Sequence, residues 1–578
     1  MRRTLRSEVK LGRYPASIGA MLRDRRDRFR GMLVLTEKAA GGNRTLLWEQ
    51  FYRQVAQVGE SLLRLGLRKG DVAAIYSRNR REMLVFELAA MSVGAVACPI
   101  FAGYPSGPLD YVLAHSAARL LAVSDDEHLR VVLSTRAARG LERIFIMDRF
   151  RPLEPVKDVP CARAFSALFG GVSLPKFERA WRRVRPLDAA LLMYTSGTSG
   201  RPKGVLLSHR NILSHQRALE LLWKLKPGGR VLSYLPWHHS FGGIFELFGA
   251  LYSGAHITLD DSYGKDIRGL IENFKRVKPT IYFSVPRIHQ ALIEESRRCR
   301  EAQRDIFHPD LCFVFTAAAP LPKHVADAYE EKCVPVVEGW GLTETSPCVT
   351  VTRFGPKRRP GAVGPPIPGV AIRIAKDGEI LVSGPNVMLG YYKDPERTAR
   401  TFTEDGWLRT GDYGDIRGRD LVLKCRMDGM FKLSNGEMVI AQNVENALVE
   451  SPLVQYAVAV GSGRDYVGVL VFPNPEAVAA AARKRGLRVS AGLFAQAERV
   501  RELIKEELEK ASRKIAEKYA RPKAAILVGG APDLANGQLT PTMKLVRSKI
   551  LEDYSLEVDA MFASRGNGQD VARKVIRL

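Results

Sequence analysis

The amino-acid sequence predicts an α/β protein with a large layered domain followed by a smaller one. Residues 1 to about 425 alternate short apolar runs, typical of strands, with longer runs of helical spacing, which is the pattern of α/β layers. A chain of 578 residues is too long for one hydrophobic core, and its 46% hydrophobic content is ample for burial. We therefore expect one domain over residues 1–425 and a second over residues 426–578.

Several runs carry this expectation in chain order. Strands are predicted at VAAIYS from residue 72, at AALLM (189–193), at IYFSVP from residue 281 and at LCFVFTAA from residue 311. A helix is predicted to begin at SHRNI (208–212), because serine is a favoured N-cap. In the smaller region, residues 497–518 have helical spacing with charges on the outer face, which indicates a structural helix.

Composition favours a cytoplasmic protein. No window approaches 18 uninterrupted apolar residues, and the first 15 residues lack the apolar stretch of a secretory signal. The cysteines form no CxxC pair, so the sequence suggests neither a disulfide framework nor a zinc site. They stand at positions 98, 161, 299, 312, 333, 348 and 425.

The net charge of +26 allows two interpretations. Basic clusters occur at 23–30, 182–185 and 297–304, and they form either a solvated surface or a surface that attracts anionic partners. No nucleic-acid module signature accompanies them, so nucleic acid is not an expected partner. Loose peripheral contact with anionic membrane lipid is the better functional interpretation, and it would suit an enzyme that takes fatty acids from a bilayer.

The run YTSGTSGRPKGV (194–205) has the composition of a loop that binds polyphosphate. Its glycines permit turns that side chains would block, its hydroxyls add donors and Lys203 adds a cation. It is not a Walker A loop, because Gly204 and Val205 follow the lysine where that pattern has Ser or Thr. A flexible surface loop is the alternative, and the apolar strand before it together with the helix start after it favours function.

Four further segments follow in order: EGWGLTETSP (338–347), GWLRTGDYG (406–414), CRMDGMFKLSNGE (425–437) and LTPTMKLVR (539–547). With them the chain resembles the adenylate-forming acyl-CoA synthetase and luciferase superfamily over most of its length. The resemblance implies a large multi-layer N-terminal domain, a small mobile α+β C-terminal domain that carries a catalytic lysine, and the use of ATP, Mg²⁺ and CoA.

The resemblance also assigns roles to individual residues. Glu344 would hold magnesium, Thr343 would donate to the α-phosphate, and Lys544 would stabilise the developing acyl-phosphate bond. Trp340 would stack on adenine, and Asp412 with Arg426 would bind ribose. The full set of nucleotide- and CoA-binding candidates is Thr195, Ser196, Gly197, Thr198, Ser199, Gly200, Lys203, Ala318, Ala319, Trp340, Gly341, Asp412, Arg426 and Gly436.

The acyl pocket is expected at LPWHHSFGG (235–243), with His239 near the substrate carboxylate and Trp237 as a wall or gate. The remaining pocket candidates are Phe241, Gly242, Gly339 and Gly341. Acetate-specific relatives tend to have a bulky aromatic at the position of Gly341, so its absence suggests a pocket for more than two carbons. The segments LSNGEMV and LTPTMKLVRSKI look most like long-chain fatty acid ligases, whereas LPWHHSFGG also resembles hydroxycinnamate ligases.

For the thiol step, the resemblance implies rotation of the small domain about Asp428, after which Gly436 would line the path of pantetheine. Gly429, beside Asp428, can supply the freedom of φ and ψ that a hinge needs. Two residues depart from the family pattern: Cys425 replaces the common glycine before the arginine, and Ala441 stands where proline is usual. Neither change removes a catalytic group.

The leading hypothesis is an ATP-dependent ligase that converts a medium- to long-chain fatty acid to its CoA thioester through an acyl-adenylate, releasing AMP and pyrophosphate. One alternative is an aryl or hydroxycinnamoyl ligase of the same mechanism, and another transfers the acyl group to an acidic carrier protein attracted by the basic surface. A non-catalytic nucleotide-binding protein is the alternative of another class, and the retained Lys203, Glu344, Asp412, Arg426 and Lys544 argue against it.

Overall fold

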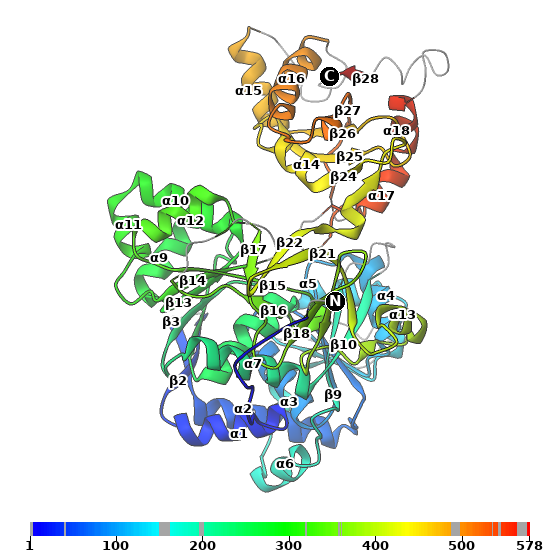
Figure 1. Cartoon of the computed structure of the whole chain (residues 1–578). Coiled ribbons are helices and arrows are strands. Elements are labelled where there is room, and N and C mark those ends of the chain that lie inside the picture. Colours follow the sequence, from blue (N-terminus) through cyan, green and yellow to red (C-terminus); the bar gives the residue numbers. More distant parts are fainter. Residues whose placement is uncertain are drawn as a thin grey trace. The chain divides into compact units, whose positions relative to one another are not determined.

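A computed structural model gives the fold and confirms the predicted α/β class. It describes residues 4–39, 42–148, 162–195, 202–317, 321–355, 359, 361–486, 498–533, 536–540, 545–562 and 575–578. These residues group into two compact units (Figure 1). The first contains the described residues up to Leu423 except Gly411–Tyr413, which group with the residues from Lys424 onward in the second.

The first unit contains an eight-stranded sheet with the order β20-β10-β9-β5-β4-β6-β7-β8. Its β4, β5, β6, β7, β8 and β9 pair in parallel, and β10 pairs antiparallel with β9. The central strands β4, β5 and β6 are apolar and buried along their whole length, as expected for parallel strands covered on both faces. The strands are β4 (Val72–Tyr76), β5 (Val96–Ile100), β6 (Leu120–Val123), β7 (Arg143–Ile146), β8 (Ala162–Ala164), β9 (Ala189–Thr195), β10 (Lys203–Ser208) and β20 (Gly390–Tyr391).

A second eight-stranded sheet has the order β16-β15-β14-β13-β11-β12-β2-β3. Its central strands are parallel, and β3 and β16 pair antiparallel at its two edges. Helices α9 to α12 gather beside β13 and β14 (Figure 1). The strands are β2 (Leu33–Ala39), β3 (Gly42–Leu47), β11 (Arg230–Ser233), β12 (His256–Leu259), β13 (Ile281–Ser284), β14 (Phe313–Thr316), β15 (Val336–Gly341) and β16 (Cys348–Val351).

Helices cover both sheets, and most begin where the sequence provides a cap or a proline. Ser208 caps α7, because its Oγ accepts a hydrogen bond from Asn211 N at 3.2 Å while the Asn211 side chain accepts one from Ser208 N at 2.7 Å. The helix predicted to begin there is confirmed. The helices are α1 (Ile18–Phe29), α2 (Trp48–Arg64), α3 (Arg81–Ser92), α4 (Ser106–Ser116), α5 (Asp126–Leu133), α6 (Leu174–Trp181), α7 (His209–Trp223), α8 (Gly249–Ser253), α9 (Ile267–Val277), α10 (Pro286–Arg298), α11 (Arg300–Ile306), α12 (Lys323–Glu331) and α13 (Pro395–Thr401).

A six-stranded sheet of order β1-β18-β19-β21-β22-β17 and four short helical segments complete these elements. The segment η3 has π-helical hydrogen bonding. This geometry is rare in proteins overall, and where it occurs it is often found at a functional site. The strands are β1 (Thr4–Arg6), β17 (Ala362–Gly364), β18 (Ala371–Ile374), β19 (Glu379–Ser383), β21 (Leu408–Arg417) and β22 (Asp420–Arg426), and the segments are η1 (Ala137–Gly140), η2 (Phe165–Leu168), η3 (Phe241–Phe248) and η4 (Thr343–Thr345).

The second unit has a four-stranded sheet of order β25-β26-β27-β28 and a hairpin of β23 and β24. Its helix α16 ends at Ser512, six residues before the predicted end at 518, because tighter turns after Ser512 bring Ile515 into the core at 4% exposure. The elements are β23 (Met430–Lys432), β24 (Met438–Ile440), β25 (Val454–Val460), β26 (Gly468–Pro473), β27 (Ala524–Leu527), β28 (Val575–Arg577), α14 (Ala441–Val449), α15 (Pro475–Lys484), α16 (Glu498–Ser512), α17 (Arg547–Asp553), α18 (Ser555–Phe562), η5 (Met427–Gly429) and η6 (Lys518–Ala520).

Candidate active site

The two strands that flank the predicted phosphate loop in the sequence are present as β9 and β10. Thr195 ends β9 and pairs in antiparallel register with Lys203, the first residue of β10. The Thr195 hydroxyl is buried, and it makes no hydrogen bond to the described residues. Ser196, Gly197, Thr198, Ser199 and Gly200 lie outside the described residues, as do Ala318, Ala319 and Lys544.

Three side chains from distant segments form a closed triangle. Lys203 Nζ donates hydrogen bonds to Glu344 Oε1 at 2.7 Å and to the Tyr391 hydroxyl at 2.8 Å, and that hydroxyl donates to Glu344 Oε1 at 2.8 Å. Burial acts to raise the pKa of the Glu344 carboxyl, but the Lys203 ammonium and the two hydrogen bonds hold that pKa below its usual value. The carboxylate is therefore charged and paired inside the protein.

Sequence reasoning selected Lys203 and Glu344 and missed Tyr391. The tyrosine lies in the run MLGYYKDPER, 188 residues from Lys203, and neither its residue type nor its spacing links it to the phosphate loop. The Lys203 ammonium also lies 4.7 Å from the centre of the Tyr391 ring, within the range of a cation–π contact. Only the pairing of β10 with β20 brings the two residues together.

The predicted acyl segment and the predicted phosphate segment meet at two hydroxyls. Ser240 Oγ lies 3.1 Å from Thr343 Oγ1, and both side chains are buried. His239 immediately precedes Ser240, and its Nδ1 accepts a hydrogen bond from Phe241 N at 3.3 Å. The structure thus brings together Thr343, Glu344 and the 239–241 segment, which the sequence placed about one hundred residues apart.

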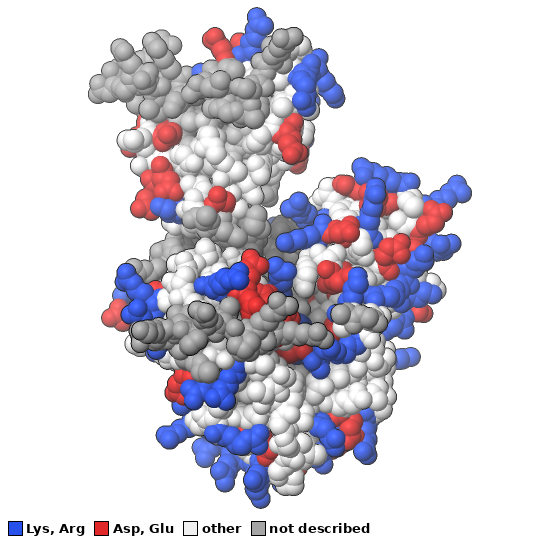
Figure 2. Space-filling view, turned by 180° about the vertical axis from the view of Figure 1, so that it is seen from behind, with Lys and Arg blue, Asp and Glu red and all other residues white. Residues whose placement is uncertain are grey.

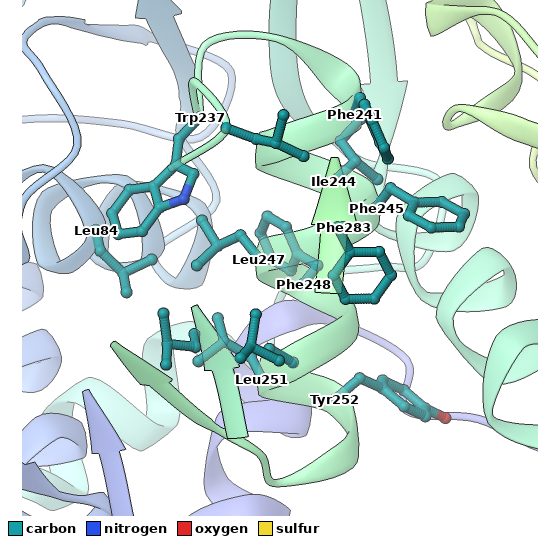
Figure 3. Packing of buried hydrophobic residues seen from close by; sticks show 14 of the residues in the cluster. Leu84, Trp237, Phe241, Ile244, Phe245, Leu247, Phe248, Leu251, Tyr252 and Phe283 are labelled. Carbon is teal, nitrogen blue, oxygen red and sulfur yellow. The ribbon is translucent and has the colours of Figure 1, made fainter. Parts of the chain in front are cut away.

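Trp237 lies in the hydrophobic core, not at an open pocket wall. Its side chain is fully buried, and its indole N–H donates to Ser233 Oγ at 3.2 Å. In turn Ser233 donates to Glu246 Oε2 at 2.6 Å. Figure 3 shows Trp237 beside Leu84 and Leu247 in this packing. The role of Trp237 as a gate stays a prediction, and its burial and hydrogen bonding are those of a core residue.

Three candidate glycines have a packing reason. A Cβ at Gly341 would lie 1.8 Å from the carbonyl oxygen of Pro347, and one at Gly242 would lie 2.4 Å from that of Pro236. A Cβ at Gly339 would lie 2.6 Å from the Phe315 ring. Close backbone packing is therefore a reason for the missing side chain at 341 that does not depend on acyl length, and the link between Gly341 and acyl length stays a prediction.

The predicted adenine platform is mostly covered. Trp340 in β15 is 8% exposed and belongs to the main hydrophobic cluster. Phe241 is similarly covered, and its ring centre lies 5.8 Å from that of Phe245 and 5.7 Å from that of Phe315. Phe245 and Phe315 are themselves only 4.3 Å apart. An aromatic cluster therefore lies directly beside the 239–241 segment.

An apolar cavity of about 500 Å³ lies on the other side of this cluster, between α7, α8 and strands β11, β13 and β14. The ring centre of Phe245 lies 5.6 Å from that of Trp223 and 5.7 Å from that of Phe283. Both Trp223 and Phe283 line the cavity. Other lining residues are Leu219, Val231, Ala250 and Phe313, with Lys224, Lys226 and Glu220 as the charged members.

The ribose-binding candidates meet within the second unit. Arg426 Nε lies 3.3 Å from Asp412 Oδ1, and the Asp412 side chain is 8% exposed against 57% for Arg426. Asp428 belongs to the single turn η5, directly after Arg426. Gly436 is exposed and has a φ of +92°, a backbone conformation that favours glycine, and a Cβ there would make only an ordinary contact with Lys432 at 3.8 Å.

The first unit and part of the second match family models. The AMP-binding enzyme model matches residues 22–392, and the model of the AMP-binding enzyme C-terminal domain matches residues 428–566. The chain belongs to the AMP-binding enzyme family. This confirms the resemblance seen in the sequence, and it makes the protein an enzyme that activates a carboxylic acid with ATP through an acyl-adenylate.

Relatives of this AMP-binding enzyme include a long-chain-fatty-acid–CoA ligase of Mycobacterium bovis, 27% identical over 88% of this chain and 91% of that one. The human long-chain-fatty-acid–CoA ligase 1 is 26% identical over 89% and 82% of the two chains. Among solved structures, an anthranilate CoA ligase in complex with anthranoyl-AMP matches with a TM-score of 0.72 and 22% identity, covering 95% of this chain and 100% of that one. The O-succinylbenzoate coenzyme A synthetase of Bacillus subtilis, bound to AMP, matches with a TM-score of 0.69 and 21% identity, over 93% and 98% of the two chains.

Proposed function

We propose that this enzyme is an AMP-forming ligase that joins a medium- to long-chain fatty acid to CoA. The observation that carries the acyl preference is the apolar cavity of about 500 Å³, whose volume falls within the range of small-molecule sites. A hydrocarbon tail inside this cavity would bury its apolar surface against the walls, which stabilises binding by about 0.8 kcal/mol for each buried methylene. The fatty-acid relatives at 26–27% identity support the same class of substrate.

In the first half-reaction, the substrate carboxylate attacks the α-phosphorus of ATP and pyrophosphate leaves. Both partners are anionic, so the protein must supply positive charge and donors. We assign Lys203 and Thr343 to the phosphates, His239 to the substrate carboxylate, and Lys544 to the developing acyl-phosphate bond. The buried Thr195 hydroxyl at the start of the phosphate loop is a further donor for a phosphate oxygen.

Magnesium is assigned to Glu344. Among the described residues no group of three or more His, Cys, Asp or Glu is arranged to hold a metal ion. Magnesium in nucleotide enzymes is commonly bound by one or two carboxylates together with substrate phosphates, so one buried, charged carboxylate beside Lys203 fits this mode. The ion would neutralise charge on the phosphates.

Asp412 and Arg426 are assigned to the ribose, since a carboxylate accepts strong hydrogen bonds from two hydroxyls. Trp340, Ala318 and Ala319 are assigned to adenine. In the second half-reaction the CoA sulfur attacks the acyl carbonyl, the thiol loses its proton and AMP leaves. Rotation about Asp428 with Gly436 beside the pantetheine is part of this proposal.

The test is pyrophosphate release with ATP and magnesium across acids from acetate through palmitate to ferulate, each with and without CoA. A cavity-filling variant, Gly249→Leu, sharpens it, because Gly249 lines the cavity. We expect Gly249→Leu to move the preferred chain length down while Gly107→Leu, which meets open space, leaves it unchanged. If the preferred chain length stays the same in Gly249→Leu, the cavity does not bind the acyl chain.

An aryl or hydroxycinnamoyl acid is the second candidate substrate. The rings of Phe241, Phe245 and Phe315 beside the 239–241 segment could stack on a planar acid. The solved structures similar in fold include ligases named for anthranilate and O-succinylbenzoate. A peak on ferulate in the acid panel would select this candidate. Release of pyrophosphate without formation of CoA thioester would indicate a carrier protein as acceptor, and no release with any acid would favour a non-catalytic nucleotide-binding protein.

Peripheral contact with anionic membrane, in the cytoplasm, stays a prediction. Many arginines of the clusters predicted to meet lipid are paired with acids: Arg23 with Asp27, Arg182 with Glu178, and Arg298 with Glu295. Figure 2 shows Lys and Arg spread over the first unit with Asp and Glu between them. No helix among the described residues has the length and apolar character needed to cross a membrane. Binding to vesicles with and without anionic lipid would test the contact.

A further inference from the structure

The Lys203–Glu344 ion pair must open if both groups are to meet ATP and its metal. Glu344 is 7% exposed, and its Oε1 accepts hydrogen bonds from both Lys203 and Tyr391. A buried charge that loses its partner costs far more than an exposed one. The free energy of opening this pair therefore depends on what remains bonded to each charge afterwards.

Tyr391 is bonded to both charges at once. Its hydroxyl donates its proton to Glu344 Oε1 and accepts one from Lys203 Nζ, and its ring lies under the same ammonium. The phenol is 8% exposed, so the contacts exclude most water. The backbone at Tyr391 is fixed as well, because Tyr391 N donates a hydrogen bond to Thr398 Oγ1, in α13, at 2.9 Å.

We infer that Tyr391 is a positioning residue that lets the Lys203–Glu344 pair open toward ATP without leaving either charge unpaired. As Lys203 turns one N–H to a phosphate oxygen, the Tyr391 hydroxyl stays on Glu344 Oε1 and the ring stays beside the ammonium. This inference rests on the proposed roles of Lys203 and Glu344. It adds a third residue that touches neither the substrate nor the metal.

The neighbouring tyrosine is a matched control. The Tyr392 hydroxyl donates to the carbonyl oxygen of Ser116 at 3.2 Å, on α4, and has no part in the triangle. Tyr391→Phe and Tyr392→Phe each remove a single phenolic oxygen from adjacent positions. Any general effect of deleting a phenol in this segment should appear in both variants.

The experiment measures the ATP dissociation constant by calorimetry in the presence of magnesium, together with KM for ATP and KM for the acid. We expect Tyr391→Phe to weaken ATP binding about tenfold, since one hydrogen bond to a charged group is lost, with KM for the acid within about twofold. Tyr392→Phe should match the wild type. In a Glu344→Gln background, which has no ion pair to open, Tyr391→Phe should change ATP binding by less than about twofold.

Wild-type ATP affinity in Tyr391→Phe would overturn the inference, and so would an equal rise of both KM values or an undiminished effect in the Glu344→Gln background. A Tyr391→Phe protein that does not fold would also overturn it, because the hydroxyl would then serve stability. Failure of the wild-type protein to bind ATP would instead count against the proposed function itself.

Discussion

The hydroxyl of Ser240 lies 3.1 Å from the hydroxyl of Thr343, so the segment predicted to bind the acid is hydrogen-bonded to the segment predicted to bind the phosphates. Both side chains are buried, and a lost partner leaves the other hydroxyl unsatisfied. The pair links the positions of the two substrates.

From this pair we expect coupled effects on adenylation. Thr343→Ala should lower kcat/KM for pyrophosphate release by about 10- to 100-fold, because it removes both the phosphate donor and the partner of Ser240. Ser240→Ala should lower kcat/KM by a smaller factor. The factor for the double variant should be smaller than the product of the two single-variant factors. Ser214→Ala, which removes a buried hydroxyl bonded to Asn211 O, is the control. Strictly multiplicative effects would show that the two segments act independently.

A side chain at position 341 should destabilise the fold. The Cβ in Gly341→Ala would lie 1.8 Å from the Pro347 carbonyl, so the backbone must shift, at a cost of about 3 kcal/mol. The urea midpoint of the first unit should fall accordingly. Gly140→Ala meets nothing within 4 Å and should be close to neutral. An unchanged midpoint for Gly341→Ala would mean that this turn relaxes easily.

Glu87 should make stability fall as pH rises. It is 1% exposed, and burial raises the pKa of its carboxyl from 4.5 to about 8. The folded protein then holds a proton that the unfolded chain has lost between these values, so the free energy of unfolding decreases across that window by up to about 1.4 kcal/mol per pH unit. Glu87→Gln should remove the decrease and gain stability over the wild type from pH 4.5 upward.

Glu82, on the same helix, is the opposite case and serves as the comparison. Burial acts to raise the pKa of its carboxyl, but Arg80 and Arg81 lower that pKa by more than burial raises it. The pKa therefore lies below the usual value. Its stabilisation is present above the unfolded pKa and is lost as pH falls. Glu82→Gln should therefore destabilise at pH 7 and matter little in acid. Equal pH profiles for the two variants would contradict both assignments.

Lys544→Ala should suppress adenylate formation and spare thioester formation from a supplied acyl-adenylate. Loss of one electrostatic donor typically lowers a rate by about 10²- to 10³-fold, and the thiol step is expected to use a different face of the small domain. Lys549→Ala, which removes an ion pair with Asp553 on α17, is the control. Equal loss in both half-reactions would refute the two-conformation mechanism.

The sequence predicted those features that depend on neighbours along the chain. The strand at 189–193 and the helix start at Ser208 follow from apolar runs and from a cap, and both are present as β9 and α7. Asp412 and Arg426 were selected as partners, and their side chains meet at 3.3 Å. Local signals of this kind survive folding because their causes are local.

Features that depend on packing could not be predicted. The sequence did not reveal that Trp237 is buried in the core with its indole bonded to Ser233, and its role at the pocket stays a prediction. The sequence linked Gly341 to substrate size, and it did not reveal that a Cβ there would lie 1.8 Å from the Pro347 carbonyl oxygen. The end of α16 at Ser512 follows from burying Ile515, and helical spacing alone does not reveal it.

The sequence by itself therefore determined the family, the α/β class and the chemistry of ATP-dependent acid activation, because short ordered motifs carry them. Only the tertiary structure decided that Tyr391 joins Lys203 and Glu344, since strand pairing brings together residues 188 positions apart. It also decided the cavity behind Phe245, because the walls of this cavity come from α7, α8 and three strands whose spacing no single segment encodes.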